Sequence, residues 1–298
     1  MNPTDDIDDI NDVFTGLRPR LHGIAYRMLG SNEEAEDVVQ DAWMRWRQTA
    51  GVAIDNEEAW LVSVVTNLSI DRLRSAKVER EHYIGTWLPE PVTPDASPSP
   101  EQMLEKVENI SIAFLTMLER LSPEGRAAFL MREVFAASYR DIALTLGKSE
   151  AACRQLVHRA KAQILEKRRR YRVAPEDHIR LLKEFAEAAQ RGDFAAMRSL
   201  LADGVELMGD GGGQVPSFAA PLRGPDRVAR LFYATRLRYG DRARMRMAPV
   251  NGEWGLLRFI DGTLESVHSV ETDGTRIVRM QVQRNPAKLA ALASVLRP

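Results

Sequence analysis

The largest concentration of side chains that could contact a charged partner is basic and lies between residues 120 and 172. That segment holds thirteen Lys and Arg residues against five Asp and Glu residues, a net charge of +8, although the whole chain carries only −1. A basic segment inside a nearly neutral chain indicates a surface that faces a polyanion such as nucleic acid. An ordinary solvated helix face is the alternative that composition leaves open.

No pattern of side chains in the sequence specifies catalysis or metal binding. The five histidines lie far apart, and none has metal-ligand spacing with another or with the single cysteine, Cys153. Glu206, Asp210 and His268 are candidate pocket groups, but their spacing defines no acid–base pair. The glycines after Asp210 lack the Gly-Lys-Ser/Thr ending of a phosphate-binding loop, and we expect them to allow close approach of the backbone to the linker. We therefore predict no catalytic residue, no metal site and no cofactor.

A proline-rich linker divides the chain. Five prolines lie between Pro89 and Pro100, which excludes a helix or a central strand there. Trp87 and Leu88 are unusual in a linker, and we expect them to dock on a partner surface; a plain turn and a free linker are the alternative. The single cysteine excludes an internal disulfide, and no stretch of about 18 apolar residues is present. These features predict a cytoplasmic protein that does not contact a membrane.

Helical periodicity precedes the linker, and a helix-turn-helix follows it. Leu17–Leu29 is periodic, Ser31 with Glu34 predicts a capping box, and Asp55 is the predicted cap of the next helix. After the linker we expect a helix over 112–121 and another that Ser122 and Pro123 begin. Ser138 and Asp141 predict a capping box on a short helix over 141–146, and Gly147 and Lys148 form the turn.

The second helix of this motif is expected to begin after Ser149 and to run to about residue 167. Its predicted inward stripe consists of Ala152, Leu156, Ala160 and Ile164. Arg and Gln on the other face can contact base edges, and Lys and Arg can also contact phosphates. The residues predicted to bind DNA here are Ser149, Glu150, Arg154, Gln155, His158, Arg159 and Lys161.

The last part of the chain has an α+β pattern. Predicted helices cover 179–190, 194–201 and 226–236, and predicted strands cover 242–250, 254–259, 263–270 and 276–283. Asn251-Gly252, Asp261-Gly262 and Asp273-Gly274 are typical turn sequences between such strands. This order predicts helices packed on a curved antiparallel sheet.

Several motifs between residues 11 and 172 carry a resemblance to a known family. Ala35-Glu36-Asp37-Val38-Val39-Gln40-Asp41-Ala42-Trp43, Ala59-Trp60-Leu61, Asn67–Arg74, Leu121-Ser122-Pro123-Glu124 and the helix-turn-helix occur in this order. Together they resemble sigma factors of the extracytoplasmic-function group, which are sigma-70-type subunits that start transcription. The resemblance implies that the first motif belongs to region 2 and binds RNA polymerase, through Glu36, Asp37, Gln40 and Asp41.

The resemblance also implies where promoter DNA is recognised. The second and third motifs resemble the helix that melts and holds the −10 element, which implies roles for Trp60, Asn67, Asp71 and Arg74. The loop over 48–56 and Asn67 would form a pocket for an unstacked base. Core packing is the alternative role for Trp43 and Trp46, where we favour it, and for Trp60. Region 4, which contains the helix-turn-helix, would bind the −35 element.

The C-terminal part resembles the SnoaL-like branch of the NTF2-like fold, through Ala189-Gln190-Arg191-Gly192-Asp193 and Leu200-Leu201-Ala202-Asp203-Gly204-Val205. Three further motifs, Trp87–Pro91, Asp210–Gln214 and Asn285–Leu289, resemble those of a sigma-factor subgroup that carries this domain. The second motif commonly ends in Lys or Arg, and the third commonly has Asp where Ala287 stands. The resemblance implies regulation by the chain's own C-terminal domain, through Trp87, Leu88, Pro89, Asp210, Gly211, Gly212, Gly213, Asn285, Pro286, Lys288 and Leu289.

The predicted architecture is therefore two all-α sigma domains followed by an α+β SnoaL-like domain with a curved antiparallel sheet. We predict region 2 over 8–83, the linker over 84–108, region 4 over 109–172 and the SnoaL-like domain over 176–290. The predicted partners are core RNA polymerase and promoter DNA, with a small ligand of the C-terminal pocket as a further candidate that no residue identifies. The alternatives are a ligand-sensing one-component helix-turn-helix regulator and an enzyme fused to a DNA-binding part. A one-component regulator has no need of the polymerase-facing or −10 helices, which favours the sigma factor.

Overall fold

The computed structural model describes residues 3–49, 54–81, 83–93, 111–168 and 173–295. The chain divides into two compact units. The helical unit comprises Met1–Glu81 and Met117–Glu166, and the C-terminal unit comprises His82–Thr116 and Lys167–Pro298. The first half of the proline-rich linker therefore belongs to the C-terminal unit.

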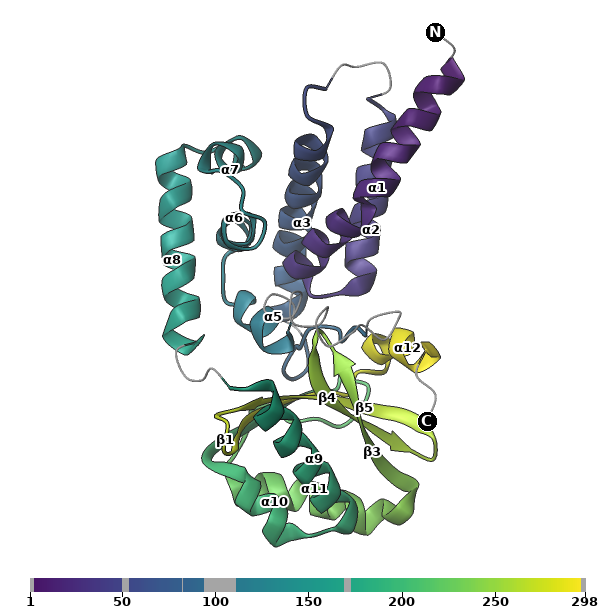
Figure 1. Ribbon diagram of the computed structural model, residues 1–298, viewed down its shortest axis with the longest axis vertical. Coiled ribbons are helices and arrows are strands. Elements are labelled where there is room, and N and C mark those ends of the chain that lie inside the picture. The colour runs from purple at the N-terminus through teal and green to yellow at the C-terminus, as the bar shows by residue number, and fades with distance from the viewer. Residues whose placement is uncertain (1–2, 50–53, 82, 94–110, 169–172, 296–298) are drawn as a thin grey trace. The chain divides into compact units, whose positions relative to one another are not determined.

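Three helices form the first part of the helical unit: α1 (Pro3–Leu29), α2 (Asn32–Arg47) and α3 (Glu57–Glu81) (Figure 1). One half of the predicted capping box on α2 is present, because the Ser31 side chain accepts a hydrogen bond from the Glu34 amide at 3.3 Å. The predicted cap on α3 is wrong by one residue. Asn56, not Asp55, accepts from the Ala59 amide at 2.9 Å, because Asn56 directly precedes the first helical residue.

Four further helices follow among the described residues: α5 (Ile112–Leu118), α6 (Pro123–Glu133), α7 (Tyr139–Leu146) and α8 (Glu150–Arg168). The predicted helix over 112–121 ends at Leu118, and α7 begins at Tyr139 rather than at Asp141. The capping box at the start of α7 and the left-handed Gly147 at its end (φ 60°) confirm the predicted helix-turn-helix. The Ser149 side chain accepts from the Ala152 amide at 3.2 Å and so caps α8.

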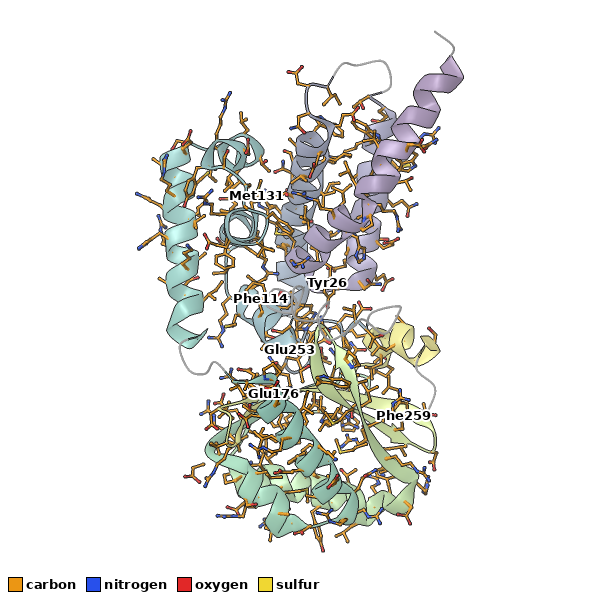
Figure 2. The ribbon with its side chains drawn as sticks, in the orientation of Figure 1. Tyr26, Phe114, Met131, Glu176, Glu253 and Phe259 are labelled. Atoms are coloured by element: carbon orange, nitrogen blue, oxygen red, sulfur yellow. The ribbon has the colours of Figure 1, made fainter. Side chains whose placement is uncertain are left out.

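The predicted inward stripe of α8 is half wrong. Ala160 and Ile164 are buried as expected, but Cys153 and Val157 occupy the inward positions where Ala152 and Leu156 were predicted. Residues spaced by four throughout drift around a helix that has 3.6 residues per turn. The observed positions 153, 157, 160 and 164 are spaced alternately by four and three, which keeps them on one face. Cys153 and Val157 pack with Met131 of α6 and Ile142 of α7, and Figure 2 labels Met131 at this contact.

The C-terminal unit is a curved six-stranded sheet with helices on both faces (Figure 1). Its helices are α9 (Pro175–Arg191), α10 (Phe194–Leu200), α11 (Pro225–Tyr239) and α12 (Pro286–Val295), with a short 3₁₀ helix over Gly240–Arg242. Its strands are β1 (Leu201–Asp210), β2 (Leu222–Arg223), β3 (Ala243–Val250), β4 (Glu253–Ile260), β5 (Thr263–Thr272) and β6 (Ile277–Gln283), in the order β2-β1-β6-β5-β4-β3.

The predicted curved antiparallel sheet is present except in one pairing, where β1 runs parallel to β6. β1 was not among the strands predicted for the sheet. Parallel pairing needs a crossover connection, and here the chain passes from β1 through α11 and the β3–β5 meander before β6 pairs with β1. The predicted Asn251-Gly252 and Asp261-Gly262 turns are confirmed. Both residues of each pair have positive φ, between 51° and 78°, as a tight hairpin turn requires.

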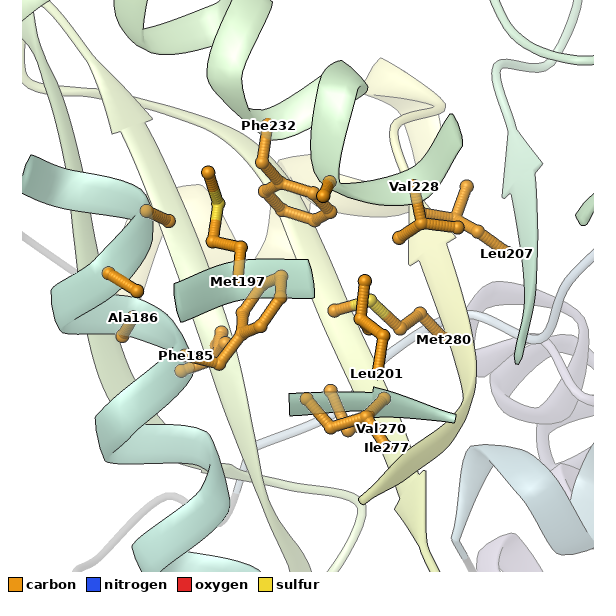
Figure 3. Packing of buried hydrophobic residues seen from close by; sticks show 14 of the residues in the cluster. Phe185, Ala186, Met197, Leu201, Leu207, Val228, Phe232, Val270, Ile277 and Met280 are labelled. Carbon is orange, nitrogen blue, oxygen red and sulfur yellow. The ribbon is translucent and has the colours of Figure 1, made fainter. Parts of the chain in front are cut away.

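Two apolar clusters fill the two faces of the sheet. α9, α10 and α11 cover one face, where Figure 3 shows Phe185, Met197 and Phe232 pointing toward Met280 of β6. The opposite face packs against α12 through Leu289 and Leu292, and Phe259 of β4 lies there (Figure 2). We call these the helix-covered face and the α12 face. Within the described part of the chain, no helix has the length and apolar content that crossing a membrane needs.

Candidate nucleic-acid interface and linker clamp

The predicted DNA-binding side chains of α8 lie together on its exposed face. Cys153 and Val157 point inward, so helical periodicity turns 154, 155, 158 and 159 outward, and all four are exposed. A groove of about 620 Å³ runs along this face, lined by Tyr139, Arg154, Gln155, Val157, His158, Arg159 and Lys161. Cationic and amide groups thus border one concave surface, as expected for contact with phosphates and base edges.

Aromatic and ionic contacts orient the basic groups of this groove. The Tyr139 ring lies between the guanidinium groups of Arg132, at 4.7 Å, and Arg154, at 5.1 Å. Arg154 also donates to Glu150 at 2.7 Å, and Arg159 donates to the Gln155 side chain at 3.2 Å. Such exposed pairs contribute little free energy, so phosphate oxygens can replace them at small cost.

The predicted −10 residues share one face of α3, but residues of α6 and α7 contact two of them. Trp60 packs on Trp46, with 5.5 Å between ring centroids, which supports a packing role for both. The Asn67 amide donates to the Thr145 carbonyl at 3.1 Å. Arg74 donates to Glu124 at 2.9 Å and Asp71 at 3.2 Å.

Asn67 is not among the described residues that line the groove at the end of the loop with which it was predicted to form a base pocket. A groove of about 540 Å³ borders the described end of that loop, and its lining residues are Asp12, Val13, Gly16, Leu17, Ile54, Asp55, Asn56, Glu57 and Glu58. Residues 50–53 of the loop lie outside the described residues. Four of the lining side chains are acidic, so this groove is not suited to phosphates.

Arg126 connects the two parts of the helical unit. Its side chain is 3% exposed, and one of its nitrogens donates to the Met28 carbonyl at 2.5 Å and to Glu119 at 2.7 Å. Met28 lies on α1, whereas Arg126 lies on α6. A buried guanidinium therefore holds the helix-turn-helix part against the first three helices.

The predicted polymerase-binding residues form an exposed polar face on α2. The opposite face is buried through Ala35, Val38, Val39, Ala42 and Trp46. Glu36, Asp37, Gln40 and Asp41 are exposed. Arg72 approaches Asp37 and Asp41 at 3.6 Å each, and Glu36 pairs with Arg18, so this face is acidic but partly neutralised.

The linker docks on the C-terminal unit around Asp210, a carboxylate with no solvent exposure. Asp210 and Gln283 are register partners at the ends of the parallel strands β1 and β6, which brings their side chains to one place on the sheet. The Asp210 carboxylate accepts from the Leu88 amide at 2.9 Å, the Tyr83 hydroxyl at 2.5 Å and the Gln283 amide at 3.2 Å. Leu88 itself is 1% exposed.

Lys288 completes the contact between linker and domain. Its ammonium group lies 2.7 Å from an Asp210 oxygen and 2.6 Å from the Leu88 carbonyl, and it sits 4.2 Å from the centre of the Trp87 ring. Burial and the Asp210 carboxylate raise the pKa of the Tyr83 hydroxyl, so it remains a proton donor. We call Tyr83, Trp87, Leu88, Asp210, Gln283, Asn285 and Lys288 the linker clamp.

The glycine loop and the third motif position this clamp. The Gly212 amide donates to Asp210 at 2.9 Å, and a Cβ at Gly212 would lie 2.3 Å from the Asn285 side chain. A Cβ at Gly211 would lie 2.2 Å from the Val215 carbonyl, and one at Gly213 would meet Ile84 of the linker at 3.2 Å. The expected close approach of the backbone to the linker is therefore present.

The third motif begins α12. Asn285 accepts from the Ala287 amide at 3.0 Å and donates to the Tyr83 hydroxyl at 3.1 Å, and Pro286 is the first residue of the helix. Leu289, the residue after Lys288, is buried against the sheet. Pro89 is also buried, and its carbonyl accepts from Gln283 at 3.3 Å.

Tyr83, Gln283 and Asn251 are contact residues that the sequence did not reveal. Asn251 and Val92 exchange two hydrogen bonds, at 2.8 and 3.0 Å, and so pair the linker with the β3–β4 turn. Asn251 was identified only as a turn residue. Tyr83 and Gln283 lie in no recognisable motif, and only their places beside the linker and at a strand end relate them to the clamp.

The three candidate pocket groups lie apart. Asp210 belongs to the clamp, Glu206 pairs with Arg223 at 3.0 Å, and His268 is buried on the helix-covered face, where its ring packs on Phe232. The described residues contain no group of three side chains arranged to hold a metal ion. The geometry therefore assigns no shared acid–base role to these three groups.

His268 should make the C-terminal unit less stable in mild acid. Burial, and then the nearby charge of Arg258, lower its pKa to about 3, so the folded unit binds no proton there while the unfolded chain does so below about pH 6.5. Stability must then fall as the pH falls from 6.5 toward 3, by up to roughly 1.4 kcal/mol per pH unit. Urea unfolding of the full chain at several pH values, followed by Trp254 fluorescence, measures this slope.

The matched variant is His268→Gln, which cannot take up a proton. Between pH 6 and pH 5, the slope of its unfolding free energy against pH should be shallower than that of the wild type. The difference should correspond to the uptake of close to one proton on unfolding. Burial also lowers the pKa of His178 in the same unit, so a smaller slope of the same sign should remain. Identical slopes for both proteins would show that His268 takes no part in the acid response.

Comparison with known proteins places the helices and the sheet in one family. Residues 13–78 match Sigma-70 region 2, and residues 111–164 match Sigma-70 region 4. The chain is 36% identical to "ECF RNA polymerase sigma factor SigJ" of Mycobacterium tuberculosis, over 96% of this chain and 91% of that protein. It is 32% identical to "Probable ECF RNA polymerase sigma factor SigI" of the same species, over 97% of this chain and 98% of that protein.

A solved structure agrees with these matches. The crystal structure of the extracytoplasmic function sigma factor SigJ of Mycobacterium tuberculosis superimposes with a TM-score of 0.75 and 31% identity, and it covers 94% of this chain and 98% of that chain. This match includes the C-terminal unit, and it fits the predicted SnoaL-like domain. The chain belongs to the extracytoplasmic-function sigma factors, the RNA polymerase subunits that recognise promoters and start transcription.

Proposed function

We propose that this sigma factor binds the −35 element with the exposed face of α8 and the −10 element with α3, and that α2 binds core RNA polymerase. The observation that carries this assignment is the groove of α8, where five polar side chains of this helix gather, four of them from positions that helical periodicity turns outward. The protein then acts in the cytoplasm and by binding, without a catalytic step. The residues proposed for −35 recognition are Ser149, Glu150, Arg154, Gln155, His158, Arg159 and Lys161.

Arg159→Ala should weaken binding to −35 DNA. An arginine that contacts bases or phosphates is worth about 1–3 kcal/mol, which corresponds to a loss of roughly 5-fold to 150-fold in affinity. Fluorescence anisotropy of a labelled −35 duplex, with the holoenzyme assembled from core polymerase and the full chain, measures the loss at fixed salt concentration.

The control is Arg180→Ala, which removes an exposed arginine of the C-terminal unit that also pairs with acids on its own helix. This variant should bind promoter DNA like the wild type. Equal affinities for wild type and Arg159→Ala would contradict the proposed role of α8.

The free protein holds its proposed −10 residues against region 4. Asn67 and Arg74 contact Thr145 and Glu124, and Lys148 pairs with Glu124 at 3.1 Å from the region 4 side. Single-stranded DNA cannot use these polar groups while region 4 occupies them. We propose that the two sigma regions separate when the protein binds core polymerase.

We also propose that the linker clamp restrains this separation. The clamp fixes Tyr83–Val92, directly after α3, on the C-terminal unit. Ten extended residues span roughly 33–36 Å, so their release increases the distance over which regions 2 and 4 can separate by at most that amount. The C-terminal domain would thereby limit promoter recognition by its own chain.

A further inference from the structure

The C-terminal unit contains a second basic segment, which runs from Arg223 to Arg246. It holds eight arginines and two aspartates, with no lysine or glutamate, so its net charge is +6. Most of the segment belongs to α11, which continues through the short 3₁₀ helix into β3 (Figure 1). Because the whole chain carries only −1, this local charge is a first indication of a surface that faces a polyanion.

The other arginines of the C-terminal unit are neutralised by acids. Among its described residues, each arginine from Arg180 to Arg198, and each from Arg258 to Arg284, forms an ion pair with a carboxylate. Three arginines of the basic segment also do so: Arg223, Arg236 and Arg242. Four others have no ion pair and no side-chain hydrogen bond to any residue that the structure describes: Arg227, Arg230, Arg238 and Arg244.

Helical periodicity brings three of these four arginines to one face of α11. Val228 and Phe232 point into the core, as Figure 3 shows, so the opposite side of the helix faces solvent. The exposed residues of that side are Arg227, Arg230, Ala234, Leu237 and Arg238, and we call them the arginine face of α11. Arg244 lies elsewhere, because its neighbour Met245 packs on the helix-covered face and successive strand residues point to opposite faces.

The length of the arginine face suits a row of phosphates. Arg227 and Arg238 are eleven residues apart, which corresponds to about 16 Å along the helix axis. The phosphates of one DNA strand recur about every 3.4 Å along the duplex axis. The face therefore spans roughly four or five phosphates of a strand.

Stability of α11 does not account for these positions. Arg227 lies in the first turn of the helix, where the dipole disfavours a cation. Arg230 follows three residues later, so two like charges are neighbours on the helix surface. The charge of Asp226 acts on Arg230, but the Asp226 carboxylate itself accepts from Arg198 at 2.7 Å. The placement of these cations thus favours a role in contact with another molecule.

The composition of the arginine face distinguishes between the possible polyanions. A helix that binds a lipid surface inserts a broad apolar face, but α11 buries its apolar side in the core and leaves Leu237 as its exposed large apolar residue. The centre of a protein interface is depleted in charged residues, whereas guanidinium groups predominate here. DNA is the polyanion that a promoter-binding chain meets, and guanidinium groups pair with its phosphates.

We propose that the arginine face of α11 binds backbone phosphates of the promoter duplex, without recognising sequence. Its three guanidinium groups release counterions from the DNA and so add affinity that falls steeply with salt concentration. The C-terminal unit is then a second DNA-binding part of the chain. This inference goes beyond the proposed function, because it requires neither the face of α8 nor the linker clamp.

The salt dependence of DNA binding tests this directly. The full chain and a triple variant (Arg227→Gln, Arg230→Gln and Arg238→Gln) bind a labelled promoter duplex and a scrambled duplex at several salt concentrations, followed by fluorescence anisotropy. Each phosphate contact contributes about 0.9 to the slope of log K against log salt concentration, so the triple variant should lose up to about 2.7 of that slope. The loss should be equal for both duplexes, because phosphate contacts carry no sequence information.

The matched control removes the same charge from arginines that already pair with acids. The triple variant Arg180→Gln, Arg191→Gln and Arg276→Gln also changes the net charge by three, and all three side chains are exposed. Its salt slope should equal that of the wild type. A second control is Arg244→Gln, which removes an unpaired arginine from the other side of the sheet and should also leave the slope unchanged.

A photo-crosslinker locates the contact. Ala234→Cys places a reactive thiol in the centre of the arginine face, and the natural Cys153 is buried and therefore protected from labelling. With the crosslinker attached there, the full chain should crosslink to DNA. The same label on Ser294→Cys, an exposed position of α12, should not.

Three results would overturn the proposed contact. One is an unchanged salt slope in the Arg227/Arg230/Arg238 variant, and another is an equal loss of slope in the charge-matched control. The third is unchanged DNA binding together with weaker binding to core polymerase or to vesicles of anionic lipid, which would assign the face to a protein or a membrane. Failure of the α8 assignment is a separate result, since it appears as unchanged promoter binding in Arg159→Ala.

Discussion

Asp210→Asn is expected to release the linker from the C-terminal unit. The neutral amide keeps the size of the side chain but removes the charge that Lys288 approaches at 2.7 Å. It also places an amide nitrogen where one carboxylate oxygen accepted hydrogen bonds. Removing one partner of a buried ion pair costs about 3–5 kcal/mol, so protection of the Leu88 amide should fall by at least about two orders of magnitude. Hydrogen exchange of the Leu88 amide measures this directly, because that amide donates to Asp210.

The control for this prediction is Asp203→Asn on the same strand. The Asp203 side chain is 98% exposed, and its contact with Arg276 is long, at 3.9 Å. This variant should leave the exchange of the Leu88 amide unchanged. If the Leu88 amide kept full protection from exchange in Asp210→Asn, apolar burial of Leu88 alone would hold the linker. The ion pair between Asp210 and Lys288 would then not be needed for docking.

Arg126→Met should destabilise the helical unit more than any exposed substitution in it. The methionine retains the apolar stem, but the Met28 carbonyl loses the guanidinium and Glu119, 19% exposed, loses its buried cation. The expected decrease in the free energy of unfolding is about 3–5 kcal/mol. Urea unfolding followed by fluorescence of Trp46 and Trp60 reports it, because Trp46 of α2 is buried and the half-buried Trp60 of α3 packs on it.

Arg120→Met is the matched control, since Arg120 is exposed and lies six residues earlier in the same part of the unit. Its unfolding free energy should change by less than about 0.5 kcal/mol. If Arg126→Met lowered the unfolding free energy as little as Arg120→Met, the two sigma regions would be held together by apolar contacts. Their separation would then not require breaking the contacts of Arg126 with Met28 and Glu119.

Local signals predicted much of the helical unit. Ser31, Ser122, Ser138 and Ser149 each cap a helix where the sequence placed one, because a cap depends only on a side chain and the amides a few residues later. Gly147 ends α7 as predicted for the same local reason. The inward stripe of α8 was misplaced, because its small residues allow two neighbouring faces and only contact with α6 and α7 selects one.

The C-terminal site required information that is not local. The parallel pairing of β1 with β6 joins Asp210 to Gln283 across 73 residues, and no periodicity encodes that contact. The motif residues Asp210, Asn285 and Lys288 were identified by resemblance, and the structure shows that they contact the linker. The hydrogen-bonded polar chain formed by Arg258, Glu265, Ser266, His268 and Arg284 was missed, because its members come from β4, from β5 and from the residue after β6 and become neighbours only through the sheet register.

The most direct test of the central assignment is run-off transcription with purified core RNA polymerase, the full chain and promoter fragments of the source genome. We expect transcripts that require the added chain, and a strong decrease with Arg159→Ala but not with Arg180→Ala. Failure to bind core polymerase, together with retained binding to duplex DNA, would contradict the account. That result would instead indicate a one-component helix-turn-helix regulator whose C-terminal domain senses a ligand.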